Sequence, residues 1–119
     1  MLQMANIPLM PAQHMDGISF LSVLRGDKKY KRGAIFWHYP HYHNQGGRPS
    51  GAVRLGDYKL IRYYDNEELE LFNLKNDIGE HINLVEKEPE KSKELNGLLS
   101  EWLRNTNSRM PLKNLNIKK

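Results

Sequence analysis

The chain has 119 residues, with 18 Lys and Arg against 14 Asp and Glu, and its sequence pI is about 9.3. A chain of this length forms at most one domain with one modest core. Because it contains no cysteine, it excludes disulfides, thiolate metal sites and a cysteine nucleophile. No apolar run approaches the roughly 20 residues that a membrane span needs.

Basic runs in one loop and in the tail carry much of the formal net charge of +4. They consist of Lys28, Lys29, Lys31, Arg32, Lys113, Lys118 and Lys119. Such runs are typical of a solvated loop and a chain terminus, whereas a nucleic-acid-binding protein needs a continuous basic face and a reading element. We therefore expect neither a nucleic acid nor a membrane as a partner.

Residues 1–15 show no helical or strand period and contain Pro8 and Pro11, which predicts an extended connection. They lack the basic segment of a signal peptide, so the sequence assigns no compartment. Their irregular, apolar-rich composition predicts cover by structure that precedes them. After them, Asp16 can cap a short helix that Gly26 ends.

Strand signals follow a polar loop. AIFWHY favours a strand that Pro40 ends, and AVRL and YKLIRYY form a hairpin around Gly56-Asp57, a pair suited to a type II′ turn. LELFNL predicts the next strand. Pro89 suits the first position of a helix that runs to about Asn105. Its apolar stripe consists of Leu95, Leu98, Leu99, Trp102 and Leu103.

These elements predict an α+β fold: a small antiparallel sheet of about four strands, packed against a C-terminal amphipathic helix. One helix covers only one face of such a sheet. The other face is either in contact with water or docked on structure outside this chain.

His38, His41 and His43 lie where the first strand passes into its loop. Imidazoles bind metals, but Pro40 interrupts the spacing and no carboxylate follows at ligand distance, so we expect no metal. Packing within the loop and contact with a ligand both remain open, because His and Tyr combine a flat apolar face with a hydrogen-bonding tip.

The cations Arg48, Arg54, Lys59 and Arg62 form a second candidate set. Arg54 and Lys59 sit on opposite arms of the hairpin and can share a face. They can attract a sulfated or carboxylated ligand, or they are ordinary strand charges paired with Glu68 or Glu70. The serines lack a G-x-S-x-G pattern, and Gly46-Gly47 precedes no helix, so neither a nucleophile elbow nor a phosphate loop is expected.

The ordered segments DGISFLSVLRG, AIFWHYPHY, GAVRLGDYKLIRYY and LELFNLKNDIGEHINL, followed by the Leu/Trp helix, resemble the C-terminal part of arylsulfatase-type sulfatases. The resemblance covers about residues 3–106. The ordered series is specific, although no single segment is, and Ile78 replaces the proline usual in the family's last segment.

The resemblance implies residues 1–15 as a connection from an N-terminal domain and residues 16–119 as the C-terminal subdomain of a sulfuric ester hydrolase. In this family the N-terminal domain holds the C/S-x-P-x-R signature that yields formylglycine, the calcium ligands, and the catalytic Lys and His. None of these motifs occurs in this chain. We therefore expect no catalytic residue, metal ligand or cofactor on it, with calcium and formylglycine in the N-terminal domain.

The resemblance also implies partners. The uncovered sheet face is expected to meet the N-terminal domain, and the loops are expected to line a cleft for a sulfated glycan or aryl sulfate. The expected substrate contacts are His38, Tyr39, His41, His43 and Arg54. Full-length members of the family are often periplasmic, secreted or lysosomal.

Two alternatives stay open at the level of the sequence. The chain could be a free-standing binding module for sulfated or anionic glycans. It could also be a fragment that self-associates through its uncovered sheet face.

Overall fold

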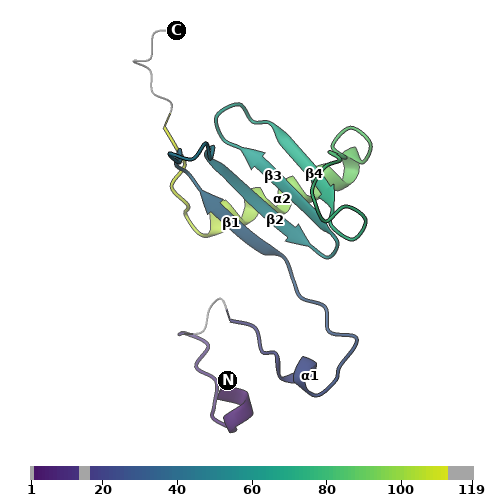
Figure 1. Ribbon diagram of the computed structural model, residues 1–119. Coiled ribbons are helices and arrows are strands. Elements are labelled where there is room, and N and C mark those ends of the chain that lie inside the picture. The colour runs from purple at the N-terminus through teal and green to yellow at the C-terminus, as the bar shows by residue number, and fades with distance from the viewer. Residues whose placement is uncertain (1, 14–16, 113–119) are drawn as a thin grey trace. The chain divides into compact units, whose positions relative to one another are not determined.

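A computed structural model describes residues 2–13 and 17–112. The chain forms two compact units, Met1–Lys31 and Arg32–Lys119 (Figure 1). The expected boundary between residues 15 and 16 falls at residues outside the described part.

The first unit contains little regular structure. It holds the 3-10 helix η1 (Leu2–Ala5) and the one-turn helix α1 (Leu21–Leu24). The helix expected from Asp16 is shorter than predicted, because the Ser19 hydroxyl accepts the Leu21 N–H at 3.2 Å in a turn just before α1. Asp16 itself lies outside the described residues. Gly26 follows α1 with φ of +86°, as expected for a glycine that ends a helix.

The second unit contains one antiparallel sheet in the order β1-β2-β3-β4, with strands Ile35–Tyr39, Ser50–Leu55, Tyr58–Tyr63 and Leu69–Asn73. β2 and β3 join through Gly56-Asp57, where Gly56 has φ of +60°. The register pairs Val53 with Leu60, and Leu60 with Leu71. These side chains therefore share one face.

Helix α2 (Pro89–Asn105) covers that face, as Figure 1 shows. The core consists of Val53, Leu60, Tyr64, Leu71, Leu95, Leu99 and Leu103, with Leu98 and Trp102 packed against it. The Trp102 ring stacks on Phe36 of β1 with centroids 4.9 Å apart and an interplanar angle of 3°. The predicted stripe of α2 thus faces the sheet, and the predicted α+β fold is confirmed.

A Schellman motif ends α2. Ser108 N–H donates to the Leu103 carbonyl at 3.0 Å, and Asn107 N–H donates to the Arg104 carbonyl at 3.1 Å. Asn107 has φ of +49°, in the left-handed region that this motif requires. The chain is thereby turned back toward β1, where the Arg109 carbonyl meets His38.

The two edges of the sheet differ. At the β4 edge, the Asn83 side chain accepts the Leu71 N–H at 3.0 Å, and Leu84 N–H donates to the Leu71 carbonyl at 2.8 Å. Asn83 and Leu84 therefore occupy the position of a further strand. At the β1 edge, no other described strand pairs with Ile35–Tyr39 on the side opposite β2.

Candidate functional site

The face of the sheet opposite α2, here called the open face, is lined by side chains that alternate with the core residues. It forms a hollow of about 500 Å³. The lining residues are Trp37, Ser50, Ala52, Arg54, Lys59, Ile61, Leu74, Ile78 and Glu80. Trp37 is 49% exposed and Ile78 82% exposed. Figure 1 looks onto this face, with α2 behind the sheet.

Lys59 forms an ion pair within the open face. Its Nζ lies 2.7 Å and 2.8 Å from the two carboxylate oxygens of Glu80. The expected pairing with Glu68 is confirmed for Arg48. It does not hold for Lys59, whose partner is Glu80, and Glu70 accepts from the Tyr63 hydroxyl instead. Glu80 stands in the irregular loop after β4 with φ of +55°, where a sequence pattern gives no indication of its partner.

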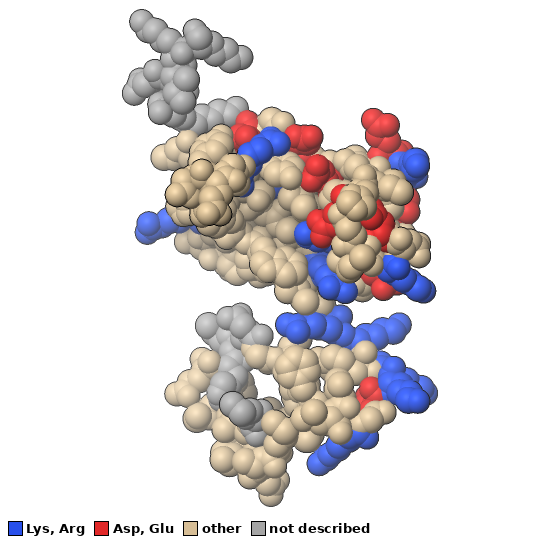
Figure 2. All heavy atoms as spheres, viewed as in Figure 1, with Lys and Arg blue, Asp and Glu red and all other residues tan. Residues whose placement is uncertain are grey.

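Arg54 is exposed and stands opposite Lys59 in the register, as the sequence predicted. Its Nε donates to the Gly56 carbonyl at 3.3 Å. Among the described residues, no carboxylate lies within ion-pair distance of Arg54. Figure 2, viewed from the same side, shows acidic groups gathered toward β4 and its following loop.

Arg48 fastens the loop before β2 to the turn after β3. Its guanidinium bonds both Asp65 oxygens at 3.1 Å and 2.8 Å, contacts Glu68 at 3.2 Å, and stacks 4.1 Å above the Tyr63 ring. The Arg48 hydrogen bonds hold the pKa of Asp65 below its ordinary value. The pKa of Glu68 is lowered by its Asn66 hydrogen bond and then by Arg48. Arg48 therefore serves to hold this loop and turn together.

His38 points to the side of the sheet that α2 covers. Its Nδ1 lies 2.8 Å from the Tyr64 hydroxyl, and its Nε2 lies 2.9 Å from the Arg109 carbonyl. Because a carbonyl only accepts, Nε2 carries the proton and Nδ1 accepts from Tyr64. Burial raises the pKa of Tyr64 to about 12. Both His38 nitrogens are therefore engaged within the protein.

Gly51 makes room for Tyr64. A Cβ at Gly51 would overlap the Tyr64 hydroxyl and approach the carbon that bears it to 3.0 Å. Gly51 pairs with His38 in the register. The Tyr64–His38 hydrogen bond therefore depends on the absence of a side chain at this position.

Tyr39 is the last residue of β1, directly after His38, and His41 and His43 lie in the loop that follows. The Tyr39 and His41 rings meet edge to face with centroids 5.6 Å apart, and Tyr39 is 44% exposed. The His43 ring accepts the Gln45 N–H at 3.1 Å, and its backbone closes a turn with Gly46 and Gly47. Tyr39 and His41 thus present a paired, exposed ring surface, while His43 shapes the loop.

The five expected site residues do not form one cluster. Tyr39 and His41 lie together, whereas His38 faces the opposite side of the sheet. Tyr39 pairs with Ser50, and Arg54 lies four residues further along β2. At about 3.3 Å per residue, Arg54 is roughly 13 Å from the Tyr39 end of the strand, and it lines the hollow of the open face instead.

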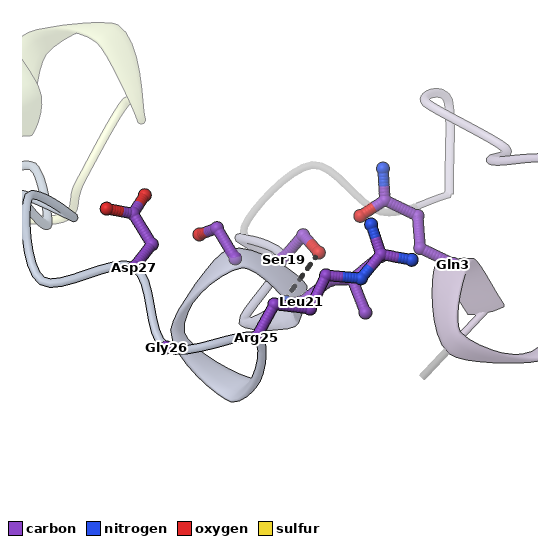
Figure 3. A pocket seen from close by; sticks show the side chains of 7 residues that line it. Gln3, Ser19, Leu21, Arg25, Gly26 and Asp27 are labelled. Carbon is purple, nitrogen blue, oxygen red and sulfur yellow. Dashed lines mark hydrogen bonds between the residues drawn. The ribbon is translucent and has the colours of Figure 1, made fainter.

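The first unit has a hollow of its own. It measures about 570 Å³ and is lined by Gln3, Ser19, Leu21, Ser22, Arg25, Gly26 and Asp27 (Figure 3). None of the expected site residues belongs to it. In the same unit, Lys and Arg side chains gather on one side (Figure 2).

Comparison with known proteins decides the family. The family model described as N-sulphoglucosamine sulphohydrolase, C-terminal, matches residues 1–109. The chain belongs to this family of sulfatase C-terminal domains. A curated sulfatase from Formosa agariphila is 34% identical over 116 residues, which cover 87% of this chain and 21% of that protein. This C-terminal sulfatase domain therefore spans about a fifth of the length of that relative.

Solved structures agree with this assignment of the C-terminal sulfatase domain. A protein in complex with its substrate D-glucosamine-2-N,6-O-disulfate is 26% identical, with a TM-score of 0.69 over 92% of this chain and 23% of that one. A 2-O GAG sulfatase is 25% identical, with a TM-score of 0.71 over 90% and 23%. A structure described as a putative sulfatase from Bacteroides thetaiotaomicron is 26% identical, with a TM-score of 0.71 over 89% and 23%.

Within residues 2–13 and 17–112, no group of three or more His, Asp and Glu is arranged to hold a metal ion. The sequence contains no cysteine and no S-x-P-x-R segment that could become formylglycine. In the same described part, no helix is long and apolar enough to cross a membrane.

Proposed function

We propose that this chain is the C-terminal part of a sulfatase, that it docks on a catalytic domain through its open face, and that it lines the substrate cleft without catalysing the reaction. The observation that carries the proposal is the contrast between the two faces of the sheet. One face buries Val53, Leu60 and Leu71 under α2. The other leaves Trp37 and Ile78 exposed around a hollow.

The exposed apolar side chains support docking. Covering apolar surface is favourable by about 25 cal/mol per Å², and contiguous exposed apolar patches commonly mark interaction sites. The matched relatives are four to five times longer than the segment that this chain matches. Their remaining length provides the domain that we propose to cover the open face.

We propose that Tyr39 and His41 contact the substrate. Their paired rings stand at the end of β1, exposed and at a right-angled contact, and a flat apolar ring with a polar tip suits a sugar ring. The proposed substrate class is a sulfated glycan or an aryl sulfate. The sulfated glucosamine bound by one relative and the glycosaminoglycan sulfatase among the others favour the glycan.

His38 and His43 support this surface indirectly. His38 links the end of β1 to Tyr64 and to Arg109 through hydrogen bonds. His43 holds the following loop through hydrogen bonds with Gln45 and Gly47. We propose that they position Tyr39 and His41 and do not themselves reach the substrate.

The test has two arms. The 119-residue chain, incubated with an aryl sulfate and calcium, should show no turnover above a heat-treated control. A chimera, in which this chain replaces the matching segment of the relative that binds its substrate D-glucosamine-2-N,6-O-disulfate, should be folded and active, and His41→Ala in it should raise KM for that sulfated glucosamine. Turnover by the chain alone, or a KM unaffected by His41→Ala, would contradict the proposal.

A free-standing binding module for anionic glycans is the second candidate. The Tyr39–His41 pair favours it, and so does the Arg54 guanidinium, which has no carboxylate partner among the described residues. It requires the isolated chain to bind a sulfated oligosaccharide, with loss of affinity on His41→Ala or Arg54→Ala. An isolated chain that does not bind leaves only the docked sulfatase domain.

A further inference from the structure

The polar groups of the open face are almost all paired within the chain. Lys59 bonds Glu80, the Tyr63 hydroxyl donates to Glu70, and Arg48 bonds Asp65 and Glu68. Of the charged side chains that line the hollow in the described part of the chain, Lys59 and Glu80 satisfy each other. Within the described residues, the Arg54 side chain has one hydrogen bond, of 3.3 Å to the Gly56 carbonyl.

The Arg54 guanidinium limits which protein surfaces can cover the open face. Burying a guanidinium without an anionic partner costs several kcal/mol, and Arg cannot escape that cost by losing its proton. A surface that closes over the hollow must therefore bring an acceptor to Arg54. A carboxylate matches the fork of the guanidinium best in a protein partner, because it accepts two parallel hydrogen bonds.

Apart from Ser50, the remainder of the hollow is apolar. Trp37, Ala52, Ile61, Leu74 and Ile78 line it beside the Lys59–Glu80 pair. The aliphatic side chains Ala52, Ile61, Leu74 and Ile78 offer no hydrogen bonds to the hydroxyl groups of a sugar, so they suit an apolar side chain better. The hollow of about 500 Å³ has room for such a side chain.

We propose that the open face is completed by a segment of the sulfatase catalytic domain that presents a carboxylate to Arg54 and an apolar side chain to the hollow. This inference rests on the proposed function and specifies its interface. A second copy of the chain fits less well. The acidic groups that its own open face would offer, Glu70 and Glu80, are already bonded to Tyr63 and Lys59.

The isolated chain is compared with the chimera built on the relative that binds D-glucosamine-2-N,6-O-disulfate. Arg54 is exposed in the isolated chain, so Arg54→Ala should leave its thermal midpoint within about 2 °C. In the chimera, Arg54→Ala should lower the midpoint by roughly 2–5 °C, because a buried carboxylate loses its partner. Arg54→Glu should lower it further, and Arg54→Lys should restore part of the loss.

Arg104→Ala is the matched control. Arg104 is also an exposed arginine, but it lies on α2, away from the open face. Its substitution should shift the isolated chain and the chimera equally. A chimera whose midpoint responds to Arg54→Ala no more than to Arg104→Ala would overturn the inference and leave the proposed function intact.

The remaining outcomes assign the open face to another occupant. A rise in KM for sulfated glucosamine on Arg54→Ala, without any shift in the midpoint, would make Arg54 a substrate residue and overturn the inference. A dimer of the isolated chain that Arg54→Glu dissociates would make the occupant a second copy. A chimera that fails to fold before any substitution would contradict the proposed function, and the inference with it.

Discussion

The Tyr64 hydroxyl donates a hydrogen bond to Nδ1 of His38 across 2.8 Å, although 26 residues separate the two in sequence. The opposite nitrogen of the same ring donates to the Arg109 carbonyl. One imidazole thus joins β1, the end of β3 and the segment after α2. This link holds the strand from which the Tyr39–His41 pair projects.

Tyr64→Phe should destabilise the protein by about 1 kcal/mol, because His38 Nδ1 loses its donor while the buried ring is retained. Tyr64 is 7% exposed, so water replaces the hydroxyl poorly. Urea unfolding followed by circular dichroism measures the change. Tyr42→Phe is the control, since Tyr42 is 70% exposed, and an equal loss in both variants would contradict the role given to the hydrogen bond.

Gly51→Ala and Gly97→Ala should have opposite effects on stability. The new methyl group at position 51 overlaps the Tyr64 hydroxyl, which predicts a loss of about 1–3 kcal/mol. At position 97, on α2, no described atom beyond the adjacent residues and the nearby backbone of the helix lies within 4 Å of the new methyl group, and alanine should stabilise the helix by up to about 1 kcal/mol. Urea midpoints of the two variants test the pair. A neutral or stabilising Gly51→Ala would show that Tyr64 can move aside.

Arg48→Ala should lower the free energy of unfolding by an amount that depends on pH. The pKa values of Asp65 and Glu68 lie below their ordinary values of 3.8 and 4.5 in the folded state. The unfolded state therefore binds more protons in acid, and the stability from the pairing is fully present above the ordinary pKa values and lost as the pH falls through the folded ones.

The difference in unfolding free energy between the wild-type chain and Arg48→Ala should accordingly be largest near neutral pH and shrink below about pH 4. Urea titrations at several pH values measure it. Arg104→Ala provides a reference whose effect stays nearly constant with pH. A difference for Arg48→Ala that persists undiminished at pH 2 would assign its role to stacking on Tyr63 instead.

High pH should destabilise the folded protein because Tyr64 loses its proton. Its pKa rises from 10.0 to about 12 on folding, so the folded state binds the proton more tightly than the unfolded state. The stability linked to this proton is complete below pH 10 and is lost as the pH rises through 12. Tyrosinate absorbance and circular dichroism should change together there. Tyr64→Phe should reduce the slope of stability against pH between these values; an unchanged slope would point to Tyr58 or Tyr63, whose pKa values are also raised.

Local patterns were sufficient to predict the regular elements of the second unit. Pro89 begins α2 and Asn105 ends it as predicted, because a proline at the first position and an apolar stripe are both local signals. Gly56 likewise marked the hairpin turn. α1 is shorter than predicted, since its sequence also permits the Ser19 turn that replaces the first helical residues.

The arrangement of the candidate site depended on contacts that no local pattern specifies. His38 shares a face with Phe36 by strand alternation, and this parity could have placed it against α2. Its partners Tyr64 and Arg109 lie 26 and 71 residues away, however, and no spacing indicates them. The Lys59–Glu80 pair was missed for the same reason, because an irregular loop sets the position of Glu80.

The two edges of the sheet differ in how readily they can pair with a strand from another polypeptide. Asn83 and Leu84 already satisfy the Leu71 backbone at the β4 edge, so a further strand could join there only by displacing them. Addition of a strand by another polypeptide would therefore begin at β1, whose sequence IFWHY has high strand propensity and no acidic or strongly basic residue. A charged substitution such as Trp37→Lys at this strand would be the place to begin in engineering a less aggregation-prone form of the isolated chain.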